Sequence, residues 1–140
     1  MIGIVVCTHG AAGRGLVQSA EMICGKQDNV SIVSYEMGDT IEDLRNLIIC
    51  DLKELNQVDG ILILTDIKGG TPFNVIVGII RDAPQYRLLT GVNVPMLLEV
   101  FINRSNITLP TLTEKAVVAA NNGIYQYISV NENMAEDEEF

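Results

Sequence analysis

Tryptophan is absent from this chain, and aromatic residues make up only 5% of its 140 residues. So few aromatic rings exclude the stacking surfaces with which many proteins hold single-stranded nucleic acid. Basic residues are also scarce, because 9 Lys and Arg are outnumbered by 18 Asp and Glu, which gives a net charge of -9. We therefore expect neither nucleic acid nor an anionic membrane surface as a partner.

Long hydrophobic runs are missing as well. No apolar stretch reaches the roughly 20 residues of a membrane-spanning helix, and no charged leader precedes the first apolar stretch. We therefore expect a cytoplasmic protein that does not insert into the membrane. The chain has a single histidine and three cysteines, Cys7, Cys24 and Cys50, without the spacing of metal or redox sites. We expect buried, reduced thiols and no metal.

Hydrophobic residues make up 48% of the chain, which suffices for one domain with a substantial core. We expect this domain to span residues 1–130. Residues 131–140 form an acidic tail without Lys or Arg, which we expect to be disordered and solvated. The acidic residues of the tail are Glu132, Glu136, Asp137, Glu138 and Glu139.

Strand and helix patterns alternate along the domain. The predicted strands are 2–7, 29–35, 60–65, 86–90 and 124–130. The predicted helices are 16–24, 40–55, 72–81, 95–101 and one that Thr113 caps and that ends at 122–123. This alternation predicts an α/β fold with a doubly wound, mainly parallel sheet and helices on both faces. We expect the strand order 2-1-3-4, with the fifth strand at an edge.

Two polar residues directly follow the most apolar strands. His9 comes after the first strand and Asp66 after the third, and a doubly wound sheet opens a ligand crevice between the carboxyl ends of those strands. A carboxylate bound to one imidazole nitrogen fixes the tautomer and raises the basicity of the other nitrogen. No serine has a promising context for a nucleophile. The sequence therefore predicts that His9 is a nucleophile and that Asp66 orients it.

A predicted helix start lies beside Asp66. Backbone N–H groups at a helix N-terminus bind phosphate without a fixed charge, so we expect Thr8, Gly70 and Thr71 to surround a phosphoryl group. The segment is not a P-loop, and the glycines at positions 10, 13 and 15 do not form a dinucleotide fingerprint. We therefore expect no cofactor. Each signal alone also has an ordinary structural explanation, and the hypothesis depends on their convergence in one crevice.

Three segments carry a resemblance to a known family. GIVVCTHG at 3–10, LTDIKGGTPFN at 64–74 and TGVNVPMLLE at 90–99 resemble the enzyme IIA (EIIA) domain of the mannose family of bacterial sugar phosphotransferase systems. The resemblance implies that His9 is phosphorylated, that Asp66 is its carboxylate partner and that Thr8, Gly70 and Thr71 lie around the phosphoryl group.

The resemblance also implies partners. The donor would be the phosphocarrier HPr and the acceptor a IIB domain, which serves the membrane components IIC and IID during sugar uptake. The family fold implies a homodimer whose subunits exchange the last strand, here 124–130. The sequence does not identify the sugar.

Two other functions are kept as alternatives. In the first, the protein is a regulatory module in which His9 reports sugar supply to a partner without onward transfer. In the second, it is a small hydrolase that uses His9 and Cys7, because Cys7 occupies a position where many relatives of the resembled family carry a small residue. This second alternative predicts inactivation by thiol reagents.

Overall fold

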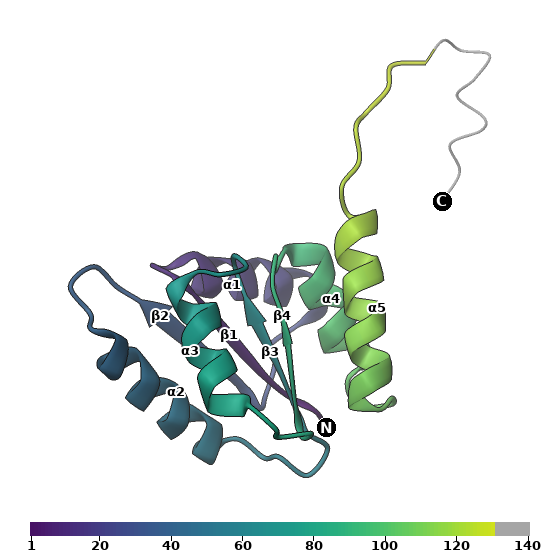
Figure 1. The fold of residues 1–140 in the computed structure, drawn as a ribbon. Helices are drawn as coiled ribbons and strands as arrows, with labels where there is room; N and C mark the ends of the chain where they lie inside the picture. The colour runs from purple at the N-terminus through teal and green to yellow at the C-terminus, as the bar shows by residue number, and fades with distance from the viewer. Residues whose placement is uncertain (131–140) are drawn as a thin grey trace.

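A computed structural model describes residues 1–130 and shows a parallel sheet between two layers of helices (Figure 1). The strands are β1 (Gly3–His9), β2 (Val30–Tyr35), β3 (Ile61–Thr65) and β4 (Tyr86–Leu89). The helices are α1 (Ala12–Cys24), α2 (Ile41–Glu54), α3 (Thr71–Ile80), α4 (Val94–Asn103) and α5 (Leu109–Asn122). The strand order is β2-β1-β3-β4 with every pairing parallel, which confirms the predicted order.

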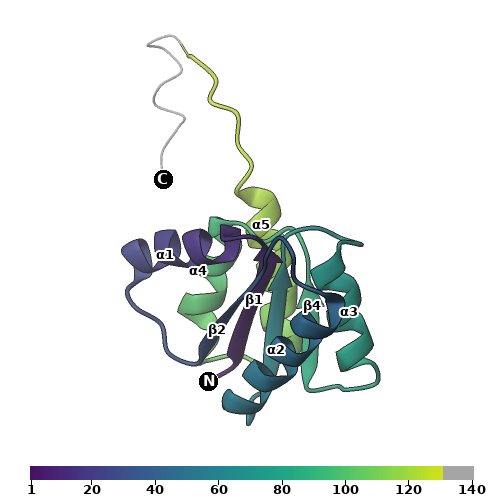
Figure 2. The same cartoon turned by 90° about the vertical axis from the view of Figure 1, so that its left-hand side faces the viewer.

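The two central strands, β1 and β3, are buried on both faces. Side chains alternate between the faces of a strand, so Ile4 and Val6 pack toward α1, α4 and α5, whereas Val5 and Cys7 pack toward α2 and α3. Figures 1 and 2 show these two helical layers on opposite faces of the sheet. The continuous apolar runs of β1 and β3 therefore reflect burial between two separate cores.

The first helix begins earlier than predicted. α1 starts at Ala12 instead of residue 16, and Gly13, which lies before the predicted helix, is buried in its first turn. A Cβ on Gly13 would lie 3.0 Å from Cγ1 of Val6 and 3.2 Å from Oγ1 of Thr8. The glycine thus allows α1 to approach β1 closely. At the other end, α1 ends at Cys24, as predicted, and Gly25 is its C-cap residue.

The start of α5 was predicted wrongly. The helix begins at Leu109 with Thr108 as its N-cap residue, and Pro110 occupies the first turn, where a missing N–H costs nothing. Thr113, the predicted cap, lies inside the helix. Its hydroxyl donates to the Leu109 carbonyl oxygen at 2.7 Å. A threonine bonded four residues back along a helix is satisfied without acting as a cap.

The predicted fifth strand is absent from the sheet that the described residues form. The segment 124–130 leaves the end of α5 and extends away from the domain (Figure 1). Its large side chains are exposed. No strand of the sheet that the described residues form pairs with this segment. The predicted acidic tail, 131–140, lies outside the described residues.

A buried arginine, Arg104, lies at the amino ends of β1 and β2, the end of the sheet opposite to His9. Arg104 is only 2% exposed, and its guanidinium donates to the carbonyl oxygens of Ile2 at 3.2 Å, Asn29 at 3.3 Å and Asp28. It also lies 5.5 Å from the centre of the Phe101 ring. Burial lowers the pKa of this guanidinium. Arg104 therefore ties the end of α4 to the start of β1 and to the connection between α1 and β2.

None of the helices within residues 1–130 combines the length and the apolar character that crossing a membrane requires.

Candidate functional site

The sheet brings His9 and Asp66 together, as the topology predicted. Cys7 is paired with Thr65 in the register of β1 and β3, so the residues that follow lie at the same edge of the sheet. Oδ2 of Asp66 lies 2.8 Å from Nδ1 of His9 and 3.0 Å from its backbone N. These two residues are 57 positions apart in the chain, and one carboxylate oxygen holds both the ring and the backbone of the histidine.

Asp66 is itself fixed in orientation. Its second oxygen, Oδ1, accepts a hydrogen bond from the backbone N–H of Ile67 at 3.0 Å. Burial alone would favour the neutral carboxyl group, but the hydrogen bonds from the ring and backbone of His9 outweigh this effect. Together they lower the pKa of Asp66 below its ordinary value. The carboxyl group is therefore ionised at neutral pH.

The bond to Asp66 determines which nitrogen of His9 carries the proton when the ring is neutral. A carboxylate can only accept, so Nδ1 carries the proton of this bond and Nε2 of the neutral ring keeps its lone pair. The side chain of His9 is 46% exposed. The arrangement therefore leaves the lone pair of Nε2 without a partner in this bond, with the tautomer set by Asp66.

Gly70 lies against the His9 ring. A Cβ on Gly70 would fall 2.9 Å from Cε1 of His9. Gly70 is also the N-cap residue of α3, and no side chain caps this helix start. Because the first N–H groups of a helix have no partner within it and carry a partial positive charge, the start of α3 provides a local anion-binding environment beside the imidazole.

The two threonines of the predicted site are placed differently from Gly70. Thr8 is fully buried, and its hydroxyl accepts from the N–H of Gly13 at 2.8 Å and donates to the carbonyl oxygen of Gly10 at 3.4 Å. This hydroxyl is thus bonded to the backbone that follows His9. Thr71, at the start of α3, lines a separate hollow of about 230 Å³ between α2 and α3. Phosphate contacts by Thr8, Gly70 and Thr71 stay predictions.

Tyr35 is a part of the site that the sequence did not indicate. It is paired with His9 in the register of β1 and β2, and its ring meets the imidazole edge to face at a centroid distance of 6.0 Å. Its carbonyl oxygen accepts from the Gly10 N–H at 2.8 Å. The predicted order places β2 beside β1, and the residue that ends β2 then lies next to His9. This adjacency could have identified Tyr35. A cavity of about 240 Å³ lies beside His9, lined by Gly10, Tyr35, Glu36, Met37 and Gly38.

The cysteines do not support a thiol-based reaction. Cys7 is fully buried in the core under α2 and α3, and burial, helped by the negative charges of Asp66 and Asp51, raises the pKa of its thiol to about 12. A thiol in that state is not a nucleophile, so the hydrolase alternative is wrong. The expectation of three buried cysteines holds for Cys7 only, because Cys24 is half-buried and Cys50 is exposed.

Metal ligands do not gather anywhere within residues 1–130. No three His, Cys, Asp or Glu side chains in that range lie close enough together to hold an ion.

Comparison with known proteins gives a consistent family. Residues 3–117 match the family described as the phosphotransferase system (PTS) fructose IIA component. The chain is 36% identical over 122 residues to the PTS mannose-specific EIIAB component of Escherichia coli, a match that covers 87% of this chain and 37% of that protein. It is 33% identical over 112 residues to the PTS fructose-specific EIIA component of Bacillus subtilis, a match that covers 80% of this chain and 77% of that protein.

Solved structures agree with these matches. The PTS component EIIA from Streptococcus agalactiae superimposes with a TM-score of 0.82 at 29% identity, covering 90% of this chain and 97% of that one. The mannose/sorbose-specific IIA subunit from Enterococcus faecalis also superimposes with a TM-score of 0.82. Its identity is 26%, and the match covers 94% of this chain and 97% of that one. The chain spans little more than a third of the length of its Escherichia coli relative. It belongs to the mannose, fructose and sorbose family of phosphotransferase-system EIIA components.

Proposed function

We propose that this protein carries a phosphoryl group on Nε2 of His9, accepting it from phosphorylated HPr and passing it to a IIB domain during sugar uptake. The observation that carries the proposal is the 2.8 Å bond between Nδ1 of His9 and Asp66. This bond occupies one ring nitrogen and leaves the other free and nucleophilic on a side chain that is 46% exposed. Membership of the EIIA family supports the same role.

The transfer step uses only these two side chains and the incoming donor. The Nε2 lone pair of neutral His9 attacks the phosphorus of a phosphorylated imidazolium on the donor. The new Nε2–P bond forms as the donor P–N bond breaks, and the donor ring leaves as neutral imidazole with the electron pair of that bond. His9 becomes a phosphorylated imidazolium, whose positive charge Asp66 stabilises through the Nδ1 proton. The return step to the acceptor reverses these events.

The surroundings of His9 bind the phosphoryl group through backbone dipoles. α1 begins three residues after His9, where the Thr8 hydroxyl already accepts from the N–H of Gly13, and α3 begins beside the His9 ring with no side-chain cap. By contrast, Thr40 caps α2 and Asn93 caps α4. Uncapped N-termini stabilise an anion moderately. A carrier benefits from such modest binding, because a tightly held group would be transferred slowly.

The proposal is tested with radiolabelled phosphorylated HPr and a IIB protein of this family. We expect label to appear on the wild-type chain, to be lost in acid and retained in alkali, and then to move to IIB. His9→Ala should abolish labelling while keeping the circular dichroism spectrum of the wild type. Labelling without onward transfer would instead support the regulatory alternative, and absence of labelling would contradict both.

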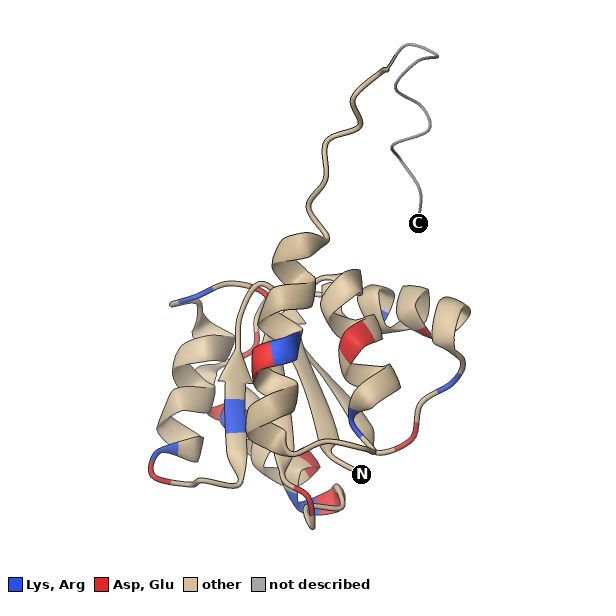
Figure 3. Ribbon diagram, turned by 90° about the vertical axis from the view of Figure 1, so that its right-hand side faces the viewer, with Lys and Arg blue, Asp and Glu red and all other residues tan. Residues whose placement is uncertain are grey.

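We also propose that the protein is a homodimer in which each subunit's segment 124–130 packs on its partner. The segment has no charged residue, and Figure 3 shows it uncharged along its length. Ile124, Tyr125, Tyr127 and Ile128 are between 61% and 81% exposed, an apolar surface that a folded monomer rarely leaves open. Ile128→Asp should convert the dimer to a monomer in sedimentation equilibrium, and a wild-type monomer would refute the proposal.

We also propose that the protein is located in the cytoplasm. Its support is the free, exposed Cys50, which fits a reducing compartment.

A further inference from the structure

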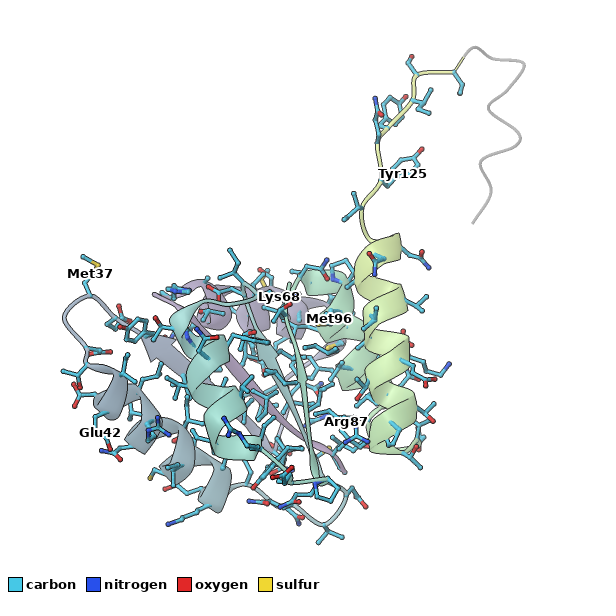
Figure 4. The ribbon with its side chains drawn as sticks, viewed as in Figure 1. Met37, Glu42, Lys68, Arg87, Met96 and Tyr125 are labelled. Atoms are coloured by element: carbon cyan, nitrogen blue, oxygen red, sulfur yellow. The ribbon has the colours of Figure 1, made fainter. Side chains whose placement is uncertain are left out.

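Met37 is the most exposed large hydrophobic residue in the described part of the chain, at 100%. It lies in the connection between β2 and α2 and borders the cavity beside His9. Figure 4 shows its side chain directed outward from the tip of this connection. A fully exposed methionine stabilises a complex when a partner buries it, and Met37 lies at the rim of the site, where a partner of His9 would arrive.

Two hydrogen bonds close the turn that carries Met37. The N–H of Asp39 donates to the carbonyl oxygen of Glu36 at 3.1 Å, and Oδ2 of Asp39 accepts from the N–H of Glu36 at 2.9 Å. Gly38 has φ +90°, a conformation that favours glycine. We call residues 36–39 the Met37 turn. Because two hydrogen bonds close this turn, Met37 is held outside the domain rather than left there by a loose loop.

A second apolar residue lies in the connection on the Asp66 side of His9. Ile67 follows Asp66 directly and is 59% exposed, and its Cγ2 would lie 2.9 Å from a Cβ on Gly70. His9 thus has an exposed apolar residue in each flanking connection, Met37 after β2 and Ile67 after β3.

Charged residues of both signs accompany this apolar pair: the Met37 turn contains Glu36 and Asp39, whereas two basic residues lie in the segments that follow Asp66 and His9. Lys68 follows Ile67, and Arg14 lies in the first turn of α1; both are exposed. Figure 4 shows Lys68 on the connection before α3, at the same edge of the sheet as the Met37 turn. Lys68 lies in the same connection as the uncapped start of α3, on the Asp66 side of His9. This side of the imidazole therefore complements a partner that arrives with a phosphoryl dianion.

We propose that Met37 is the principal anchor for the phosphodonor protein, a partner that presents a phosphorylated imidazole on an apolar surface. The inference rests on the proposed carrier function and adds the residue that determines donor affinity. Apolar side chains that become desolvated at the centre of an interface dominate binding, and methionine adapts to surfaces of different shape. The donor is favoured over the acceptor because only the donor brings negative charge to an unphosphorylated site.

The test measures the rate of His9 phosphorylation against the concentration of phosphorylated HPr, for wild type and Met37→Gln. We expect the half-saturating concentration to rise about tenfold, which corresponds to about 1.4 kcal/mol, with the maximal rate changed less than about twofold. Met37→Leu should restore the wild-type affinity, because leucine keeps the apolar surface. Met22→Gln is the matched control, since Met22 is 84% exposed in the last turn of α1, about 15 Å along that helix from its start near His9.

A small phosphodonor separates docking from chemistry. Phosphoramidate phosphorylates imidazole without a protein surface, and we expect wild type and Met37→Gln to react with it at equal rates. An unchanged half-saturating concentration for HPr in Met37→Gln would overturn the inference while leaving the carrier function intact. A slower reaction of the variant with phosphoramidate would also overturn it, because Met37 would then act on His9 itself. Failure of wild type to accept phosphate from HPr would instead refute the carrier function.

Discussion

Gly70 lies beside His9 at a position where a side chain would collide with the imidazole: a Cβ on Gly70 would lie 2.9 Å from Cε1 of the ring. The backbone of Gly70 has φ -71° and ψ 170°, which any residue can adopt. The glycine is therefore required by the space next to the histidine ring and not by its own conformation. This contact makes the orientation of His9 sensitive to a single methyl group.

Gly70→Ala should displace the His9 ring and lengthen its bond to Asp66. Since small misplacements of reacting groups cost up to about a hundredfold in rate, we expect phosphorylation by both HPr and phosphoramidate to slow by about 10- to 100-fold. Gly78→Ala is the matched control in the same helix, because a Cβ there meets only Nη1 of Arg45 at 3.9 Å. Wild-type rates in Gly70→Ala would show that the ring has more room than the structure indicates.

Asp66→Asn should remove the control of the His9 tautomer. The amide can donate to Nδ1 and so favour the proton on Nε2, which then has no lone pair for attack. By analogy with the aspartate of a catalytic triad, we expect transfer from HPr to slow by a factor on the order of 10³. Stopped-flow or quenched-flow measurement of the phosphoprotein tests this, and a loss of less than about tenfold would contradict the assigned role.

The same variant yields a pH-dependent stability prediction. The pKa of Asp66 is lower in the folded protein than its ordinary value of 3.8, so the ionised carboxylate favours the folded state. This contribution is present above the ordinary value and is lost as the pH falls through the lower, folded-state pKa. Urea unfolding of wild type and Asp66→Asn should therefore give a difference in unfolding free energy that shrinks below about pH 4. A difference that grows on acidification would be inconsistent with a lowered pKa.

Arg104→Met should destabilise the fold without changing the chemistry. The substitution leaves the carbonyl oxygens of Ile2, Asp28 and Asn29 without their buried donor. We expect a loss on the order of 3 kcal/mol in the free energy of unfolding, with an unchanged transfer rate for the protein that remains folded. Arg81→Met, an exposed position at the end of α3, should change stability by less than about 0.5 kcal/mol. Equal stabilities of the two variants would refute the structural role of Arg104.

Thiol labelling distinguishes the cysteines. A water-soluble maleimide should modify Cys50 rapidly in the native protein and leave Cys7 unmodified until the chain unfolds, because Cys7 is buried and its pKa is raised to about 12. Peptide mass mapping after timed labelling identifies the modified residue. Phosphorylation of His9 should survive modification of Cys50. Rapid native labelling of Cys7, with loss of function, would revive a thiol mechanism.

The sheet and the His9–Asp66 pair could be predicted from the sequence because they depend on local patterns. Continuous apolar runs identify strands buried on both faces, and their alternation with helices determines the order of a doubly wound sheet. The carboxyl ends of β1 and β3 then lie together whatever the intervening loops do. For this reason two residues 57 positions apart could be placed in one site.

The features that were missed depend on contacts that no local pattern contains. The alternating segment 124–130 has the composition of a strand, but a strand forms only where it pairs with a neighbour, and in this structure it pairs with no strand of its own chain. The capping ability of Thr113 was outweighed by Pro110 at the start of α5. Tyr35 lies in the site because it is paired with His9 in the register of β1 and β2. Arg104 can be buried because its guanidinium donates to carbonyl oxygens of residues 75 and 102 positions away in the chain.

The most direct test of the account is the identity of the phosphorylated nitrogen. Long-range ¹H–¹⁵N correlation spectra of the ¹⁵N-labelled phosphoprotein distinguish a phosphoryl group on Nε2 of His9 from one on Nδ1. Because Asp66 holds Nδ1 at 2.8 Å, we predict phosphorylation on Nε2 with the proton retained on Nδ1. A phosphoryl group on Nδ1, or on any residue other than His9, would contradict the account.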